Sequence, residues 1–219
     1  MKNLTASLLL LALVFLPVHA HSKMVGEKNH GKWTSFILLG DKRTTSRMVT
    51  PGIDESELTV LAIESYPGTC EEPMVIIIWP DVPMSKTYEG VVTGSMRVDK
   101  RSIFDIEYVV QVDNSNMMLY PRIRSMPTIF KDLIGGAMVR FKINPIPEVG
   151  ISKPVYKRYS LSGFTAAYRR TLGLCQEIQE LQTHEKQKND SDYFDENSVP
   201  KMTPDPTIKT KESDSDYFI

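Results

Sequence analysis

The sequence predicts a mainly β protein: an antiparallel β-sandwich or barrel with a C-terminal α-helix packed on it, followed by a disordered tail. Short segments rich in β-branched and aromatic residues follow one another, each bounded by Gly, Pro or Asp. No helical segments alternate with them, which favours antiparallel over parallel pairing. Clear helical periodicity comes only near the end, and a polar segment with three prolines follows it.

The strongest strand is predicted over residues 103–112, where apolar and polar side chains alternate. Phe104 and Ile106 would point to a buried side, while Asp105 and Glu107 would point to solvent. Further strands are expected over residues 33–39, 43–49, 58–65, 74–79, 88–98, 117–120, 137–143 and 155–161, and a short helix over residues 127–134.

Residues 1–20 have the pattern of a cleavable secretory signal peptide. Lys2 supplies a positive charge, residues 8–16 form an apolar run, and the small residue Ala20 precedes the expected cut. The apolar run is shorter than the roughly 20 residues that a transmembrane helix needs. We therefore expect an exported protein, periplasmic or extracellular, without a transmembrane segment after cleavage. An uncleaved anchor is the alternative. A polar N-terminal arm is predicted over residues 21–32.

The two cysteines, Cys70 and Cys175, predict one disulfide, because an even number in an exported chain normally pairs. A reactive thiol or a metal site is the alternative, but no His lies nearby and the Cys-x-x-Cys spacing is missing. Cys175 falls on the apolar stripe of the terminal helix, which is expected to begin at Ser162 and to include Leu181. The bridge would therefore join this helix to the sheet and complete a β-domain over residues 33–182.

Residues 183–219 form the predicted disordered, acidic tail. Five Lys stand there against nine Asp and Glu, a net charge of −4, whereas residues 21–182 carry about +2. The tail contains the sequence Ser-Asp-Tyr-Phe twice, 24 residues apart. An aromatic pair in an acidic segment can anchor in a partner's pocket and be steered by a basic rim. We therefore predict docking of an unidentified cell-envelope protein; a repeat arisen by chance is the alternative. The predicted partner-binding residues are Tyr193, Phe194, Tyr217 and Phe218.

The run YSLSGFTAA at residues 159–167, followed by Cys175, resembles the ending of small exported bacterial proteins of the invasion-associated locus B type. In that family a β-strand leads into a terminal helix that carries a cysteine. Trp33, and Cys70 ahead of a β-rich segment, are also similar. The long tail and the lack of a second cysteine pair depart from the family's pattern. The resemblance implies a periplasmic β-sandwich and no catalytic residues.

Motifs of common enzyme classes are missing. No serine lies in a Gly-x-Ser-x-Gly turn, and no His lies within residues 31–183 to act as a base. Phosphate loops and metal-binding motifs are missing as well, so we predict no catalytic residues, metal or cofactor. The balanced charge gives no support for a nucleic-acid partner. We expect a non-enzymatic binding or adaptor protein. The alternative is a carboxylate-based envelope enzyme acting on a carbohydrate or a similar substrate.

Several basic residues are spread over the predicted β-domain and can gather on one of its faces, for which the acidic tail would be a counterpart. They are Arg97, Lys100, Arg101, Arg122, Arg124, Arg140 and Lys142.

Overall fold

The computed structural model describes residues 23–40, 43–53, 58–80, 82, 87–113, 116–123 and 126–193. Ten strands form one antiparallel sheet in the order β1-β2-β3-β4-β5-β8-β7-β6-β9-β10. The strands are β1 (Lys23–His30), β2 (Trp33–Leu39), β3 (Thr44–Pro51), β4 (Val60–Ser65), β5 (Met74–Trp79), β6 (Tyr88–Val98), β7 (Ile103–Asp113), β8 (Asn116–Arg122), β9 (Met138–Ile143) and β10 (Val155–Ser160). The helices are α2 (Met126–Ile134), η1 (Pro147–Val149) and α3 (Phe164–Tyr193). The predicted mainly antiparallel β fold with a C-terminal helix is confirmed.

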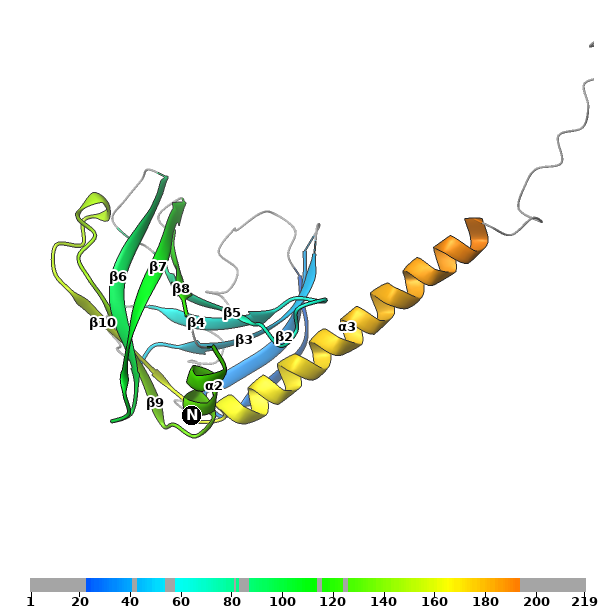
Figure 1. Ribbon diagram of the computed structural model, residues 1–219, viewed down its shortest axis with the longest axis horizontal. Helices are drawn as coiled ribbons and strands as arrows, with labels where there is room; N and C mark the ends of the chain where they lie inside the picture. Colours follow the sequence, from blue (N-terminus) through cyan, green and yellow to red (C-terminus); the bar gives the residue numbers. More distant parts are fainter. Residues whose placement is uncertain are drawn as a thin grey trace, which may run out of the picture. The chain divides into compact units, whose positions relative to one another are not determined.

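The sheet curls so that its two halves face each other (Figure 1). Gly52, just after β3, forms a β-bridge with Tyr159 of β10. The backbone N–H of Ile53 donates a hydrogen bond to the carbonyl oxygen of Arg158 at 2.9 Å. These contacts tie strand β10, at one end of the strand order, to the middle of the other half. The apolar sides of both halves point inward and enclose the main core, while a second buried cluster lies on β2–β5 and includes Phe36, Val49 and Ile76.

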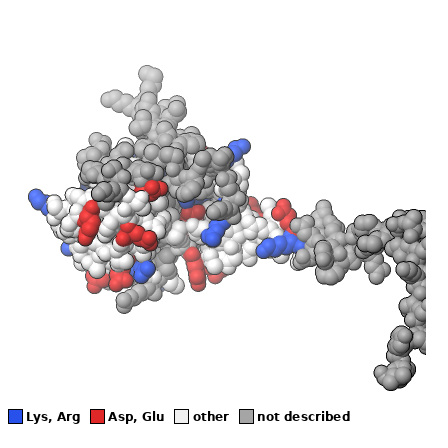
Figure 2. Space-filling view, turned by 90° about the horizontal axis from the view of Figure 1, so that it is seen from above, with Lys and Arg blue, Asp and Glu red and all other residues white. Residues whose placement is uncertain are grey.

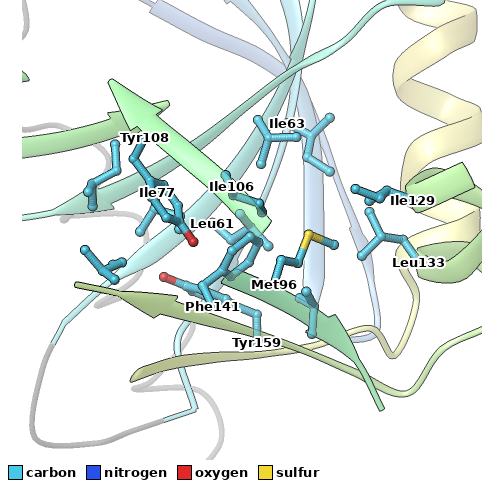
Figure 3. Close-up of a cluster of buried hydrophobic side chains, with 14 of the residues drawn as sticks. Leu61, Ile63, Ile77, Met96, Ile106, Tyr108, Ile129, Leu133, Phe141 and Tyr159 are labelled. Carbon is cyan, nitrogen blue, oxygen red and sulfur yellow. The ribbon is translucent and has the colours of Figure 1, made fainter. Parts of the chain in front are cut away.

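The main core lies between the two halves of the sheet and is closed by α2 (Figure 3). Alternation along most strands supplies it, since every second residue faces inward, whereas all six residues of β4 are buried. The rings of Phe141 and Tyr159 meet edge to face, with centroids 6.0 Å apart. Fully burying each such large side chain contributes about 1.5–3 kcal/mol. The labelled members of the cluster are Leu61, Ile63, Ile77, Met96, Ile106, Tyr108, Ile129, Leu133, Phe141 and Tyr159.

No strand was predicted in the polar arm over residues 21–32, but Lys23–His30 form strand β1. This edge strand pairs with β2 through its backbone and has a bulge between Val25 and Lys28. Gly26 lies in the bulge with φ +66°, and the guanidinium of Arg170 donates to its carbonyl oxygen at 2.6 Å. Backbone pairing and a side chain from a distant helix thus hold a strand whose own side chains are mostly polar.

The run at residues 159–167 is the junction of β10, the β1–β2 turn and α3. The indole Nε1 of Trp33 donates to the carbonyl oxygen of Ser160 at 2.9 Å, and its ring meets the ring of Phe164 edge-on at 5.2 Å. Gly163 has φ +89°, and a Cβ atom there would lie 1.7 Å from the carbonyl oxygen of His30. Only glycine fits at this position, because both the conformation and the close backbone approach exclude a side chain.

Helix α3 packs on the sheet through one stripe, and the predicted disulfide between Cys70 and Cys175 is present, with the Cα atoms 5.8 Å apart. Midway along the stripe, the hydroxyl of Ser46 donates to the carbonyl oxygen of Thr171 at 2.8 Å. The disulfide therefore fixes a stretch of helix that apolar and polar contacts already hold against the sheet. The buried residues of the stripe are Phe164, Ala167, Thr171, Cys175 and Ile178.

The helix is longer than predicted, since it continues to Tyr193 rather than ending near residue 182. The sheet, α2 and the helix as far as Glu180 form one compact unit, and the helix from Leu181 onward belongs to a second. Leu181, expected on the apolar stripe, is 66% exposed. Good helix formers such as Glu, Lys and Gln account for the extension without burial. Among the described helices, none has the length and apolar character needed to cross a bilayer.

Candidate functional site: a basic face on β6, β9 and β10

Three arginines lie in one row across β6, β9 and β10. Arg97 is directly opposite Arg140 in the β6–β9 register, and Arg140 is directly opposite Arg158 in the β9–β10 register. Directly paired residues of an antiparallel sheet point to the same side, and neighbouring strands are about 4.8 Å apart. Lys142 follows Arg140 by two positions and shares its side. We call these four residues the basic face.

This side of the sheet is the outer one. The residues that alternate with the basic face, Val139, Phe141 and Tyr159, are buried in the core, whereas Arg140 and Arg158 are exposed. Arg97 is half-buried. The row therefore stands on the surface, over the main core.

Like charges directly opposite one another destabilise a sheet, so the row needs compensation. Within the protein, the guanidinium of Arg140 donates to the carbonyl oxygen of Asp99 at 3.0 Å. The Nε atom of Arg97 is buried and has no hydrogen-bond partner among the described residues. Ion pairs are formed elsewhere on the protein by Arg47 with Glu64 and by Arg101 with Asp132.

Exposed apolar side chains lie beside the basic face. Ile103 of β7 is directly opposite Arg97 and is 63% exposed. Tyr156 of β10 is directly opposite Lys142 and is 65% exposed. The outer surface here thus combines cations with an aliphatic and an aromatic group.

A cleft of about 570 Å³ lies farther along the same strands. Glu107 and Arg122 are directly opposite one another in it, and the amide of Asn144 donates to the hydroxyl of Thr93 at 2.9 Å. Carboxylates, a guanidinium and an amide can together bind hydroxyl groups. The residues lining the cleft are Thr93, Gly94, Asp105, Ile106, Glu107, Arg122 and Asn144.

A second cavity, of about 700 Å³, lies beside the disulfide. Its lining includes Glu71, Glu72 and Glu180, and the side-chain oxygen of Gln179 accepts a hydrogen bond from the backbone N–H of Gly68 at 3.1 Å. Nowhere in the described part of the chain do three His, Cys, Asp or Glu side chains form a group suited to a metal ion.

The seven basic residues singled out in the sequence are only partly brought together. Arg97, Arg140 and Lys142 belong to the basic face. Arg101 instead binds Asp132 and the carbonyl oxygen of Gly135, and Arg122 lies in the cleft. Lys100 is exposed in the turn between β6 and β7, and Arg124 is outside the described residues. On the face that Figure 2 shows, acidic and basic side chains are interspersed.

Sequence reasoning missed two cations of β10. Arg158 completes the row, but only the pairing of β9 with β10 reveals this. Its neighbour Lys157 points to the opposite side, is 2% exposed, and places its Nζ atom 3.5 Å from the ring centroid of Trp79. The sequence could have predicted these opposite orientations, because neighbouring residues of a strand point to opposite sides of the sheet.

The predicted partner-binding residues of the tail are only partly covered by the structure. Tyr193 is the last residue of α3, and the structure describes its backbone but not its side chain. Phe194, Tyr217 and Phe218 lie outside the described residues. Docking through the tail therefore stays a prediction.

No family model matches the sequence, and no curated protein matches it. Among solved structures, the chain is similar to the crystal structure of invasion associated protein B from Bartonella henselae. The identity is 13%, the TM-score is 0.48, and the match covers 69% of this chain and 99% of that chain. The structural comparison thus finds a protein of the type that residues 159–167 resemble.

Proposed function

We propose that this chain is an exported, non-enzymatic binding protein that holds an anionic partner on its basic face. The row formed by Arg97, Arg140 and Arg158 is the observation that carries the proposal. The disulfide supports export, because such bonds persist in oxidising compartments, and the signal-like residues 1–20 agree with it.

A partner with several negative charges would convert an unfavourable arrangement into a favourable one. Guanidinium groups bind phosphate and carboxylate in bidentate fashion, more strongly than neutral hydrogen-bonding groups do. Because the arginines project from adjacent strands, an extended anion can contact them at the same time. Attraction to the anion then offsets the repulsion between the neighbouring arginines.

The test is binding of inorganic polyphosphate, a soluble polyanion, to the full-length oxidised protein at several salt concentrations. We expect the double variant Arg97→Gln with Arg140→Gln to raise Kd at least about tenfold and to weaken the salt dependence. Arg169→Gln, which removes an exposed arginine of α3, is the matched control and should bind as the wild type does. Unchanged affinity in the double variant would refute the proposal.

Docking of a cell-envelope protein through the tail is a second part of this proposal. It rests on the repeated Ser-Asp-Tyr-Phe sequence. Capture from an envelope extract would compare the wild type with a chain in which Tyr193, Phe194, Tyr217 and Phe218 are all alanine. A variant with Val199→Ala and Met202→Ala is the control for loss of apolar tail residues. A partner retained by the fourfold variant would exclude the tail as its docking segment.

The cleft favours one alternative function, a carboxylate-based envelope enzyme acting on a carbohydrate. Asp105 and Glu107 both line the cleft, and paired carboxylates are the usual acid and base of glycoside hydrolysis. Release of reducing ends from a panel of polysaccharides would reveal such an activity. It should disappear in Asp105→Asn and Glu107→Gln but survive the change of Arg97 and Arg140 to Gln. If no polysaccharide releases reducing ends, the enzyme alternative is rejected and the binding function remains.

A further inference from the structure

We infer that the anionic partner is the surface of an anionic phospholipid bilayer, and that the basic face docks against its headgroups. This inference rests on the proposed binding function and names the partner class. It is carried by the placement of Ile103 and Tyr156 on the same outer surface as the arginine row.

The two apolar side chains are in register with the cations. Ile103 extends the row beyond Arg97, and Tyr156 stands opposite Lys142 in the adjacent row. Side chains on one side of a sheet project roughly perpendicular to it, so both stand on the outer surface that carries the cations. Tyrosine is favoured at the headgroup level of membranes, where its ring lies among apolar groups and its hydroxyl stays wet.

A small soluble anion fits this surface less well. Small ligands bind in concave sites, and neither the cleft on these strands nor the cavity beside the disulfide includes a member of the basic face. The cleft also contains Asp105 and Glu107, whose charges repel anions. A broad partner can instead reach the cations of β6, β9 and β10 together.

Both contributions that peripheral membrane binding needs are therefore present. Electrostatic attraction to anionic lipids acts on Arg97, Arg140, Lys142 and Arg158, and falls off within a Debye length. Burial of Ile103 and Tyr156 among headgroups adds a term that salt does not screen. A soluble polyanion such as polyphosphate would use the first contribution but has no apolar groups for the second.

The experiment is co-sedimentation of the full-length oxidised protein with vesicles of phosphatidylcholine, with and without phosphatidylglycerol. We expect binding only when phosphatidylglycerol is present. Arg97→Gln with Arg140→Gln should weaken it roughly thirtyfold, the product of two lost headgroup attractions. Ile103→Ser with Tyr156→Ser should weaken vesicle binding about tenfold or more but leave polyphosphate binding unchanged. Ile134→Ser, which changes an exposed isoleucine of α2, is the control.

A Trp introduced by Tyr156→Trp gives a second readout. Its fluorescence should shift to the blue and be quenched by brominated lipid when phosphatidylglycerol vesicles are added.

If polyphosphate binds but the vesicles do not, or if the serine variant binds vesicles as the wild type does, the bilayer inference is wrong and the proposed function stands. If neither probe binds, both are wrong. Thermal unfolding of each variant confirms that it is folded.

Discussion

Cys175 of α3 is bonded to Cys70, which lies 105 residues earlier in the chain, between β4 and β5. Both residues are buried. In the chain-entropy description, closing a loop of this length stabilises the fold by about 4–5 kcal/mol. We therefore expect the double variant Cys70→Ser with Cys175→Ser to lose free energy of unfolding of that order. Urea denaturation measures it, and wild-type protein under a reductant should behave like the variant. An unchanged midpoint would mean that helix packing alone holds α3.

Gly163 gives the sharpest test of the junction between β10, β1 and α3. Gly163→Ala places a methyl group against the carbonyl oxygen of His30 and keeps a left-handed conformation, so we expect a loss of more than about 2 kcal/mol or failure to fold. Gly173→Ala is the matched control on α3, because a Cβ there meets nothing within 4 Å. That change should stabilise the protein by about 0.5–1 kcal/mol. Equal thermal midpoints for the two variants would contradict this account.

The elements best predicted from sequence are those whose type and bounds are determined by their own side chains. β2, β5 and β6 have the predicted bounds, because their β-branched and aromatic residues lie between turn-forming residues. β1 was missed because its stability comes from backbone pairing and from Arg170. The end of α3 was missed because local propensity, without an apolar stripe, continues the helix.

The basic face was only partly predictable for a different reason. Alternation along each strand tells which side a residue takes, but not which strand lies beside it. β6 pairs with β9, and the chain between them passes through β7, β8 and α2. The meeting of Arg97 with Arg140 and of Arg140 with Arg158 is therefore a property of sheet order and register. No local pattern in the sequence contains it.

Alkaline pH should destabilise the protein through tyrosines that the fold buries wholly, as Tyr108, or partly, as Tyr66. Burial, and then the nearby carboxylate of Glu64, raises the pKa of Tyr66 to about 12. Burial also raises the pKa of Tyr108, with a smaller effect from Tyr159. The unfolded chain releases these protons near pH 10, before the folded protein does. The stabilisation that these tyrosines contribute is therefore fully present below about pH 10. It is lost as the pH rises from about 10 toward their folded-state pKa values.

Urea midpoints between about pH 9 and pH 11 measure this loss. Tyr66→Phe should make the decline less steep, because its proton no longer contributes. Tyr156→Phe, at an exposed position, is the control and should follow the wild type. A decline of equal steepness in Tyr66→Phe would assign the alkaline sensitivity to other groups.

Arg140→Glu separates folding from binding. The new carboxylate would stand between Arg97 and Arg158, where opposite charges across strands contribute about 0.2–1 kcal/mol per pair. This gain outweighs the loss of the exposed hydrogen bond to Asp99, so we expect a higher urea midpoint at low salt and a smaller difference at high salt. Binding to phosphatidylglycerol vesicles should be lost in the same variant.

Arg169→Glu, at an exposed site of α3, should change neither property. A rise in stability with loss of binding is the signature of a surface kept for a ligand, since functional sites often retain arrangements that cost stability. A lower midpoint together with normal vesicle binding would mean the opposite. The row would then be compensated within the protein, and Arg140 would serve the fold through Asp99 rather than a partner.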